Sequence, residues 1–136
     1  MTIVGEGLDA AKRGTFTEQE LRNGYKQSMT SLTGIPLLFP ILGETGCRLA
    51  EIVGLRIEDV DLDDRVLHIR PNDKRRLKTA GSERSLPLNH TACLALSMAL
   101  EYADDEWMFP RSINEDGCYA TYASNALAKW TKRKWN

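Results

Sequence analysis

The sequence predicts an α+β domain that is mainly α-helical, with helices packed around a small three-stranded antiparallel sheet. Two patterns predict this class. Apolar residues recur at three- and four-residue spacing toward both ends of the chain, which is the period of a helix with one buried face. Between residues 57 and 88, three short segments bounded by turn residues have the length of strands. The 136 residues are enough for one domain with a hydrophobic core.

The N-terminal part of the chain predicts a short leader and two helices. Residues 1–14 contain three glycines and no clear period, so we expect a leader or the stub of a linker. A helix from about 18 to 32 follows, because Thr17 and Glu20 can form a capping box. Its expected buried side comprises Leu21, Tyr25, Met29 and Leu32. Residues 35–43 are nearly all apolar and contain Pro40, which favours a kinked buried helix, with a buried strand as the alternative.

Residues 43–62 are the stretch around which the rest of the chain is organised. A turn at Thr45-Gly46 precedes a short helix whose expected buried residues are Leu49, Ile52, Val53 and Leu55. Arg48 is predicted at the first turn of this helix, with Glu51 beside it. The helix dipole favours anions at that end, so an anion bound there would explain the arginine. A salt bridge of Arg48 with Glu51 or Glu44 is the alternative.

The remaining segments complete the predicted sheet and add two helices. We expect strands over residues 57–62, 66–70 and 84–88, with a loop around Gly81. Asn89 or Thr91 can cap the next helix, whose expected buried face is Cys93, Leu94, Leu96, Ala99 and Leu100. We expect residues 107–110 to form a short, apolar, buried edge segment and residues 114–117 to form a loop. A last helix runs from about 119 to 134, with Tyr122, Leu127 and Trp130 facing inward.

Charge along the chain is uneven although the net charge is only −1. Residues 70–84 contain six basic and two acidic residues, whereas residues 101–116 contain six acids and one arginine. Such segregation can create one basic face, and solvated loops are the alternative. No apolar run approaches ~20 residues, so we expect no membrane span. Three widely spaced cysteines without a metal pattern indicate reduced thiols in a cytoplasmic protein.

Two motifs in this chain resemble those of a known family. Residues 45–62, TGCRLAEIVGLRIEDVDL, resemble the first signature box of the tyrosine recombinase (phage integrase) catalytic domain. The family pattern is roughly T-G-x-R-x-x-E-x-x-x-L-x-x-x-D-(V/I)-D. A second match, KTAGSERSLPL over residues 78–88, follows in the order that the family has.

The resemblance implies a chemical role for several side chains. Arg48 would stabilise negative charge at the scissile phosphate, since a forked guanidinium matches two phosphate oxygens. Lys78 would protonate the leaving 5′ oxygen as a general acid. Glu51 would support Arg48. The residues expected to contact DNA are Lys74, Arg75, Arg76, Thr79 and Arg84. Arg84 would support the hairpin or touch a phosphate. The family reaction, recombination through a phosphotyrosine intermediate, implies neither a cofactor nor a metal.

The later family motifs have no counterpart in these residues. The second family box, H-x-x-R, is matched by neither His68 nor His90, and all four tyrosines precede the place where it would fall. We therefore expect residues 15–136 to be a partial catalytic domain, truncated before that box and the nucleophilic tyrosine, and inactive alone. At full length it would act on double-stranded DNA as a homo-oligomer. The alternatives are a stand-alone DNA-binding or regulatory relic of an integrase, and a non-catalytic protein-interaction domain.

Overall fold

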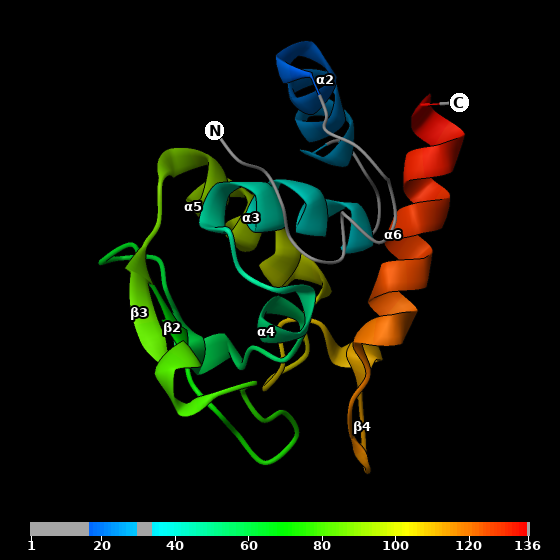
Figure 1. Cartoon of the computed structure of the whole chain (residues 1–136). Coiled ribbons are helices and arrows are strands. Elements are labelled where there is room, and N and C mark those ends of the chain that lie inside the picture. Colours follow the sequence, from blue (N-terminus) through cyan, green and yellow to red (C-terminus); the bar gives the residue numbers. More distant parts are fainter. Residues whose placement is uncertain (1–16, 30–33, 136) are drawn as a thin grey trace.

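The computed structural model describes residues 17–29 and 34–135, and it has the predicted mixed architecture (Figure 1). Helices surround a buried core, and a three-stranded antiparallel sheet in the order β1-β2-β3 lies at one side. In Figure 1, α2 lies above α3, α6 runs along the opposite side from the sheet, and α4 lies between them. The predicted α+β class is therefore confirmed. The expected leader over residues 1–14 lies outside the described residues.

Helix α2 (Glu18–Met29) begins with the predicted capping box. The Glu20 N–H donates to Thr17 Oγ1 at 3.1 Å, and the Thr17 N–H donates to Glu20 Oε1 at 2.9 Å. Tyr25 then docks the helix, since its ring packs edge-on to Phe39 and its hydroxyl donates to Glu44 Oε2 at 2.8 Å. Burial and this hydrogen bond raise the pKa of Tyr25. The expected continuation to Leu32 lies outside the described residues.

Residues 35–45 form the central buried helix. A 3-10 turn, η1 (Ile35–Leu37), leads into α3 (Leu38–Thr45), so the strand alternative is wrong. Pro40 is the third residue of α3, where a missing N–H breaks no intrahelical hydrogen bond. The helix ends at Gly46, which has a φ of 69° and donates its N–H to Leu42 O at 3.0 Å. This left-handed cap places the next residues at the start of α4.

Helix α4 and the sheet form the middle of the chain. In α4 (Leu49–Val53), the residues predicted to face inward are buried, as is Leu55 just beyond its end. Strands β1 (Val60–Asp61), β2 (Val66–Ile69) and β3 (Arg84–Pro87) pair antiparallel, with Leu67 opposite Val60 and Leu86. The expected strand over residues 57–62 is mostly wrong. Residues Ile57–Asp59 form the 3-10 turn η2, which Asp59 closes by accepting the Arg56 N–H on Oδ2.

Helix α5 (His90–Ala99) is capped by Asn89, whose Oδ1 accepts the Ala92 N–H at 2.9 Å. The 3-10 turn η4 (Leu100–Tyr102) extends it by one turn. The predicted inward position of Leu94 is wrong, because 44% of this residue is exposed. The helix instead buries Ala92, Ala95, Leu96 and Ala99, which share one face at three- and four-residue spacing. Leu94 lies about half a turn away from that face.

The C-terminal part adds an edge segment, a small hairpin and a long helix. Trp107 forms a bridge to Arg56, and Trp107, Met108 and Phe109 are buried as predicted. After η5 (Pro110–Ser112), the expected loop is a hairpin of β4 (Ile113–Asn114) and β5 (Gly117–Cys118), because the Asn114 side chain accepts two backbone N–H groups of the turn. Helix α6 (Ala120–Trp135) follows.

Helix α6 buries a slightly different face from the predicted one. Leu127 and Trp130 face inward as predicted, and the Trp130 ring meets Phe39 edge-on. The predicted inward position of Tyr122 is wrong, because 40% of this residue is exposed and its neighbour Ala123 is buried instead. Ala123, Leu127 and Trp130 have helical spacing, so a small residue and not the tyrosine fits where α6 approaches the core. Among the described residues, no helix is long and apolar enough to cross a membrane.

Candidate functional site

An open cavity of about 600 Å³ brings the two sequence motifs together. Its wall is formed by residues 48–51 at α4, residues 75–78 of the β2–β3 loop, and Ala120, Thr121 and Ser124 of α6. We call it the basic cavity, because it contains Arg48, Arg75, Arg76 and Lys78. Arg48 and Lys78 are 30 residues apart in sequence and line the same cavity.

Arg48 is the N-cap of α4 and not, as predicted, a residue of its first turn. Its backbone is extended, with φ −76° and ψ 150°, and its N–H donates to Glu51 Oε1 at 2.9 Å. The half-buried residue forms part of the cavity wall. The glycine cap of α3 and the carboxylate of Glu51 thus fix the backbone from which this guanidinium extends.

Glu51 holds the second arginine of the motifs. The Arg84 guanidinium donates to both carboxylate oxygens of Glu51, from Nη1 to Oε2 at 3.0 Å and from Nη2 to Oε1 at 3.1 Å. The Glu51 side chain is 6% exposed. Burial by itself would raise the pKa of Glu51, but the hydrogen bonds from Arg84 and from the Arg48 N–H, with their charges, lower it. The same pair raises the pKa of Arg84. Arg84 therefore joins β3 to α4.

Two exposed cations of the β2–β3 loop lie at the basic cavity. Arg76 and Lys78 are exposed and line the basic cavity. Thr79 is exposed, and its hydroxyl lies 3.0 Å from Ser82 Oγ. Lys74, also predicted to contact DNA, is half-buried and its Nζ donates to Glu115 O at 2.9 Å. The loop therefore divides its cations between the cavity and the β4–β5 turn.

Arg75 is the predicted DNA contact whose position differs most from expectation. The residue is 5% exposed and packs against Gly54, to whose carbonyl Nη2 donates at 3.4 Å. Its Nε and Nη1 are buried and have no hydrogen-bond partner among the described residues. Burial lowers the pKa of Arg75, against the opposing influence of the charges of nearby groups. A buried cation with so few direct partners is costly in a protein interior.

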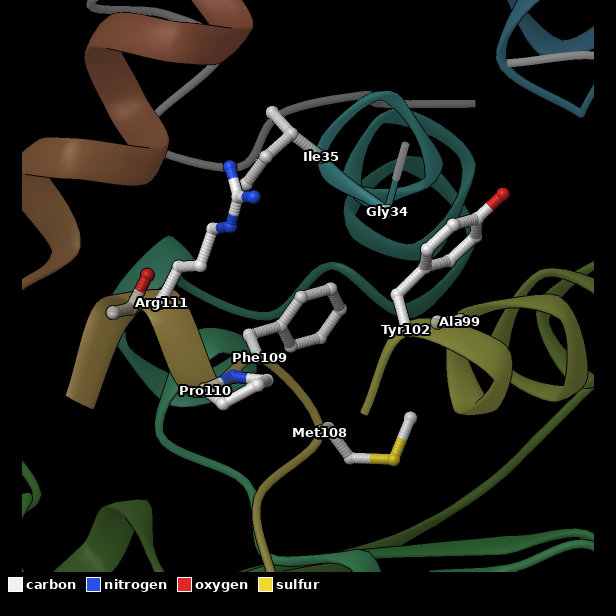
Figure 2. A pocket seen from close by; sticks show the side chains of 9 residues that line it. Gly34, Ile35, Ala99, Tyr102, Met108, Phe109, Pro110 and Arg111 are labelled. Carbon is white, nitrogen blue, oxygen red and sulfur yellow. The ribbon is translucent and has the colours of Figure 1, made fainter. Parts of the chain in front are cut away.

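A second cavity, of about 230 Å³, has a different character and shares no residue with the basic cavity. Figure 2 shows the Phe109 ring at its centre, with Tyr102 and Arg111 on either side and Met108 below. Arg111 Nη1 donates to the hydroxyl of Tyr122 at 3.3 Å. This mostly apolar cavity lacks the cluster of cations that defines the first, so we place the candidate site at the basic cavity.

Sequence reasoning missed several residues that shape the basic cavity. Ala120, Thr121 and Ser124 form one wall, yet they lie more than forty residues beyond Lys78 and carry no local signal. Gly54 and Asn72 were also missed. The Pro71-Asn72-Asp73 turn signal gave a hint, since Asn side chains commonly cap such turns.

Burial raises the pKa of the Cys47 and Cys118 thiols near this site. Among the described residues, no group of three His, Cys, Asp or Glu side chains could hold a metal ion.

In this helical domain with a small antiparallel sheet, an arginine at a helix start and a loop lysine thus line one open cavity. Residues 16–134 match the phage integrase family, and the chain therefore belongs to this family. The activity of the family is site-specific DNA recombination and integration. No curated protein sequence matches the chain.

Two solved structures resemble the fold. The crystal structure of XerA recombinase has a TM-score of 0.62 and 18% identity over 90% of this chain and 44% of its own. The Tn1549 transposon integrase, solved in complex with a circular intermediate DNA, has a TM-score of 0.64 and 15% identity over 92% of this chain and 46% of its own. This chain thus spans less than half the length of either solved chain, and the similarity to them is a similarity of fold.

Proposed function

We propose that this chain is the part of a tyrosine recombinase catalytic domain that carries the transition-state arginine and the general acid. The observation that supports it is the basic cavity, which Arg48 from the first motif and Lys78 from the second both line. In the proposed reaction, a tyrosine attacks a DNA phosphodiester and forms a 3′-phosphotyrosyl link, and a 5′ hydroxyl later attacks that link. The substrate is double-stranded DNA, bound by a homo-oligomer of the full-length protein.

Arg48 is the proposed electrostatic catalyst. Attack on the phosphodiester concentrates negative charge on the non-bridging oxygens, and a guanidinium can donate to two of them at once. The Glu51 carboxylate accepts the Arg48 N–H and both donors of Arg84, so it fixes the backbone at this arginine. Glu51 and Arg84 are therefore supporting residues in this proposal, and neither reacts.

Lys78 is the proposed general acid. As the bond from phosphorus to the 5′ oxygen breaks, the Lys78 ammonium gives its proton to that oxygen, and the neutral amine takes a proton back in the reverse step. The residue is exposed on the loop beside the cavity, which leaves its ammonium accessible to a bound phosphate. Arg76 and Thr79, exposed on the same loop, are proposed contacts to the DNA backbone.

The 136 residues are proposed not to cleave DNA alone, because they contain no H-x-x-R sequence. Incubation with a nicked duplex that traps covalent intermediates tests this directly. The expected result is no protein–DNA adduct on a denaturing gel. An adduct that a single tyrosine substitution abolishes would overturn the proposal of inactivity.

A DNA titration tests the function of the cavity. We expect the chain to bind duplex DNA weakly, with an affinity that falls steeply as salt rises. Arg48→Ala and Lys78→Ala should each weaken binding several-fold, and each should reduce the salt slope by about one. Arg22→Ala and Lys26→Ala are matched controls, since both residues are exposed on α2, away from the cavity. Absence of DNA binding at low salt would reject the proposal in favour of a protein-interaction domain.

A further inference from the structure

The β2–β3 loop is held by hydrogen bonds a few residues before Lys78, the proposed general acid. Within the loop, Asn72 Oδ1 accepts the N–H groups of Lys74 and Arg75 at 2.9 Å each, and the Asn72 N–H donates to Arg75 O at 3.0 Å. These bonds close a tight turn. Three residues beyond this turn lies Lys78, so the orientation of the turn limits where that lysine can reach.

The turn is attached to the end of α4 at Gly54. Asn72 Nδ2 donates to Gly54 O at 2.9 Å, and Arg75 Nη2 donates to the same oxygen at 3.4 Å. The backbone of Gly54, with φ −94° and ψ 10°, is open to any residue, so its conformation does not require glycine. Space does. A Cβ at this position would lie 2.6 Å from Nε, 2.8 Å from Cγ and 3.0 Å from Cβ of Arg75.

The other side of the turn is attached to the β4–β5 hairpin. The Cys118 N–H donates to Lys74 O at 2.9 Å, and Lys74 Nζ donates to Glu115 O, also at 2.9 Å. The loop is therefore held between the end of α4, the helix whose N-cap is Arg48, and a hairpin that leads directly into α6. The turn thus contacts the residue that follows α4 and the hairpin that precedes α6, and these two helices form the rest of the cavity wall.

We propose that Arg75 is a positioning residue for the reaction, and that its packing on Gly54 fixes the loop so that Lys78 faces Arg48 across the basic cavity. The inference rests on the proposed function of these two residues. Arg75 would touch no DNA, since it is 5% exposed and its Nε and Nη1 are buried. The Arg75 side chain occupies the space where a side chain at position 54 would lie.

The test uses substitutions that conserve charge. Gly54→Ala displaces the Arg75 side chain, and rotation of the guanidinium cannot relieve the clash because Cβ and Cγ of Arg75 are also involved. Arg75→Lys is the second variant, which keeps the charge and removes the planar group. Gly81→Ala is the matched control on the same loop, because a Cβ there would meet only Thr79 Oγ1, at 4.0 Å.

Two measurements on the 136-residue chain are required. Hydrogen exchange should show faster exchange of the Lys74 and Arg75 amides in Gly54→Ala and Arg75→Lys, and unchanged exchange in Gly81→Ala. DNA affinity at low salt should fall about threefold or more in the two variants, yet by less than about twofold when Lys78 is already alanine. This loss of effect in the Lys78→Ala background separates positioning from a general loss of stability.

Each failure has its own signature. Unchanged exchange of the Lys74 and Arg75 amides in both variants overturns the proposal whatever the DNA result. Equal losses of affinity with and without Lys78 overturn it as well, because the residue would then not act through this lysine. If Lys78→Ala binds DNA with the same affinity as wild type, the proposed function is rejected first, and the positioning role of Arg75 with it.

Discussion

Arg75 and Arg84 belong to the same basic stretch and both turn toward α4, but they are held in opposite ways. Arg84 is about one-third exposed and donates to both carboxylate oxygens of Glu51. Arg75 is almost fully buried, and two of its nitrogens have no partner among the described residues. This difference indicates that one arginine contributes to stability and the other to the geometry of the site. Arg84 with Glu51 stabilises the fold, whereas Arg75 determines where the loop lies.

Loss of the Glu51 carboxylate is the change that most directly tests the stabilising half of this comparison. Glu51→Ala leaves the Arg84 guanidinium and the Arg48 N–H without their acceptor. Because Arg84 is partly exposed and can be solvated, we expect a loss of about 2–3 kcal/mol in the free energy of unfolding. Urea denaturation measures it. Glu51→Gln, which keeps one acceptor oxygen, should lose less. A loss below about 1 kcal/mol for the alanine variant would show that the pair contributes little to stability.

The same ion pair should make stability depend on acid pH. The folded-state pKa of Glu51 lies below its ordinary value of 4.5, so the unfolded state binds more protons as the pH falls through this range. The stabilisation is therefore complete above about pH 4.5 and is lost as the pH falls through the folded-state pKa. A plot of the free energy of unfolding against pH, from pH 6 to pH 3, should be flatter for Glu51→Gln than for wild type. Parallel curves would contradict this assignment.

The turn before Arg48 should contribute a smaller amount through the backbone alone. Gly46 has a φ of 69°, and no atom lies within 4 Å of the position that a Cβ would take. Gly46→Ala should therefore cost about 1 kcal/mol, entirely from the left-handed conformation. Thermal unfolding measures it, with Gly81→Ala as a control in open space. An equal cost at both glycines would contradict the backbone explanation.

Arg75→Met is expected to have the smallest effect on stability, in contrast to the variants of Glu51. Methionine keeps an apolar stem against Gly54 and removes a buried charge that few groups contact directly, so stability should change by no more than about 1 kcal/mol. Urea denaturation beside Glu51→Ala makes the comparison direct. A loss comparable to that of Glu51→Ala would show that Arg75 has the same structural role as Arg84.

Local patterns in the sequence predicted most of the fold. Thr17 with Glu20, Gly46 and Asn89 each mark a helix boundary that the structure confirms, because capping depends on side chains within a few residues. The failures have the same local origin. Leu94 and Tyr122 are apolar or aromatic and were predicted inside, whereas the packed faces use alanines beside them. Which face of a helix is buried depends on its neighbour, and that neighbour is distant in sequence.

The candidate site was only partly predictable, for a related reason. The two motifs identify Arg48 and Lys78, but residues 74–76 read Lys-Arg-Arg, and nothing local distinguishes them. In the structure Lys74 meets the β4–β5 turn, Arg75 is buried on Gly54 and Arg76 lines the basic cavity. Each outcome depends on an element that the chain forms before or after this stretch.

The class of fold, the boundaries of most helices and the two motifs can be read from the sequence, because spacing, caps and turn residues act over a few positions. Which loop cations are exposed at the basic cavity, and which are buried or paired, depends on tertiary contacts. The physical reason is that burial and ion pairing are set by groups brought together from α4, the β2–β3 loop and α6. A guanidinium has the same chemistry at all these positions, and its surroundings alone assign its role.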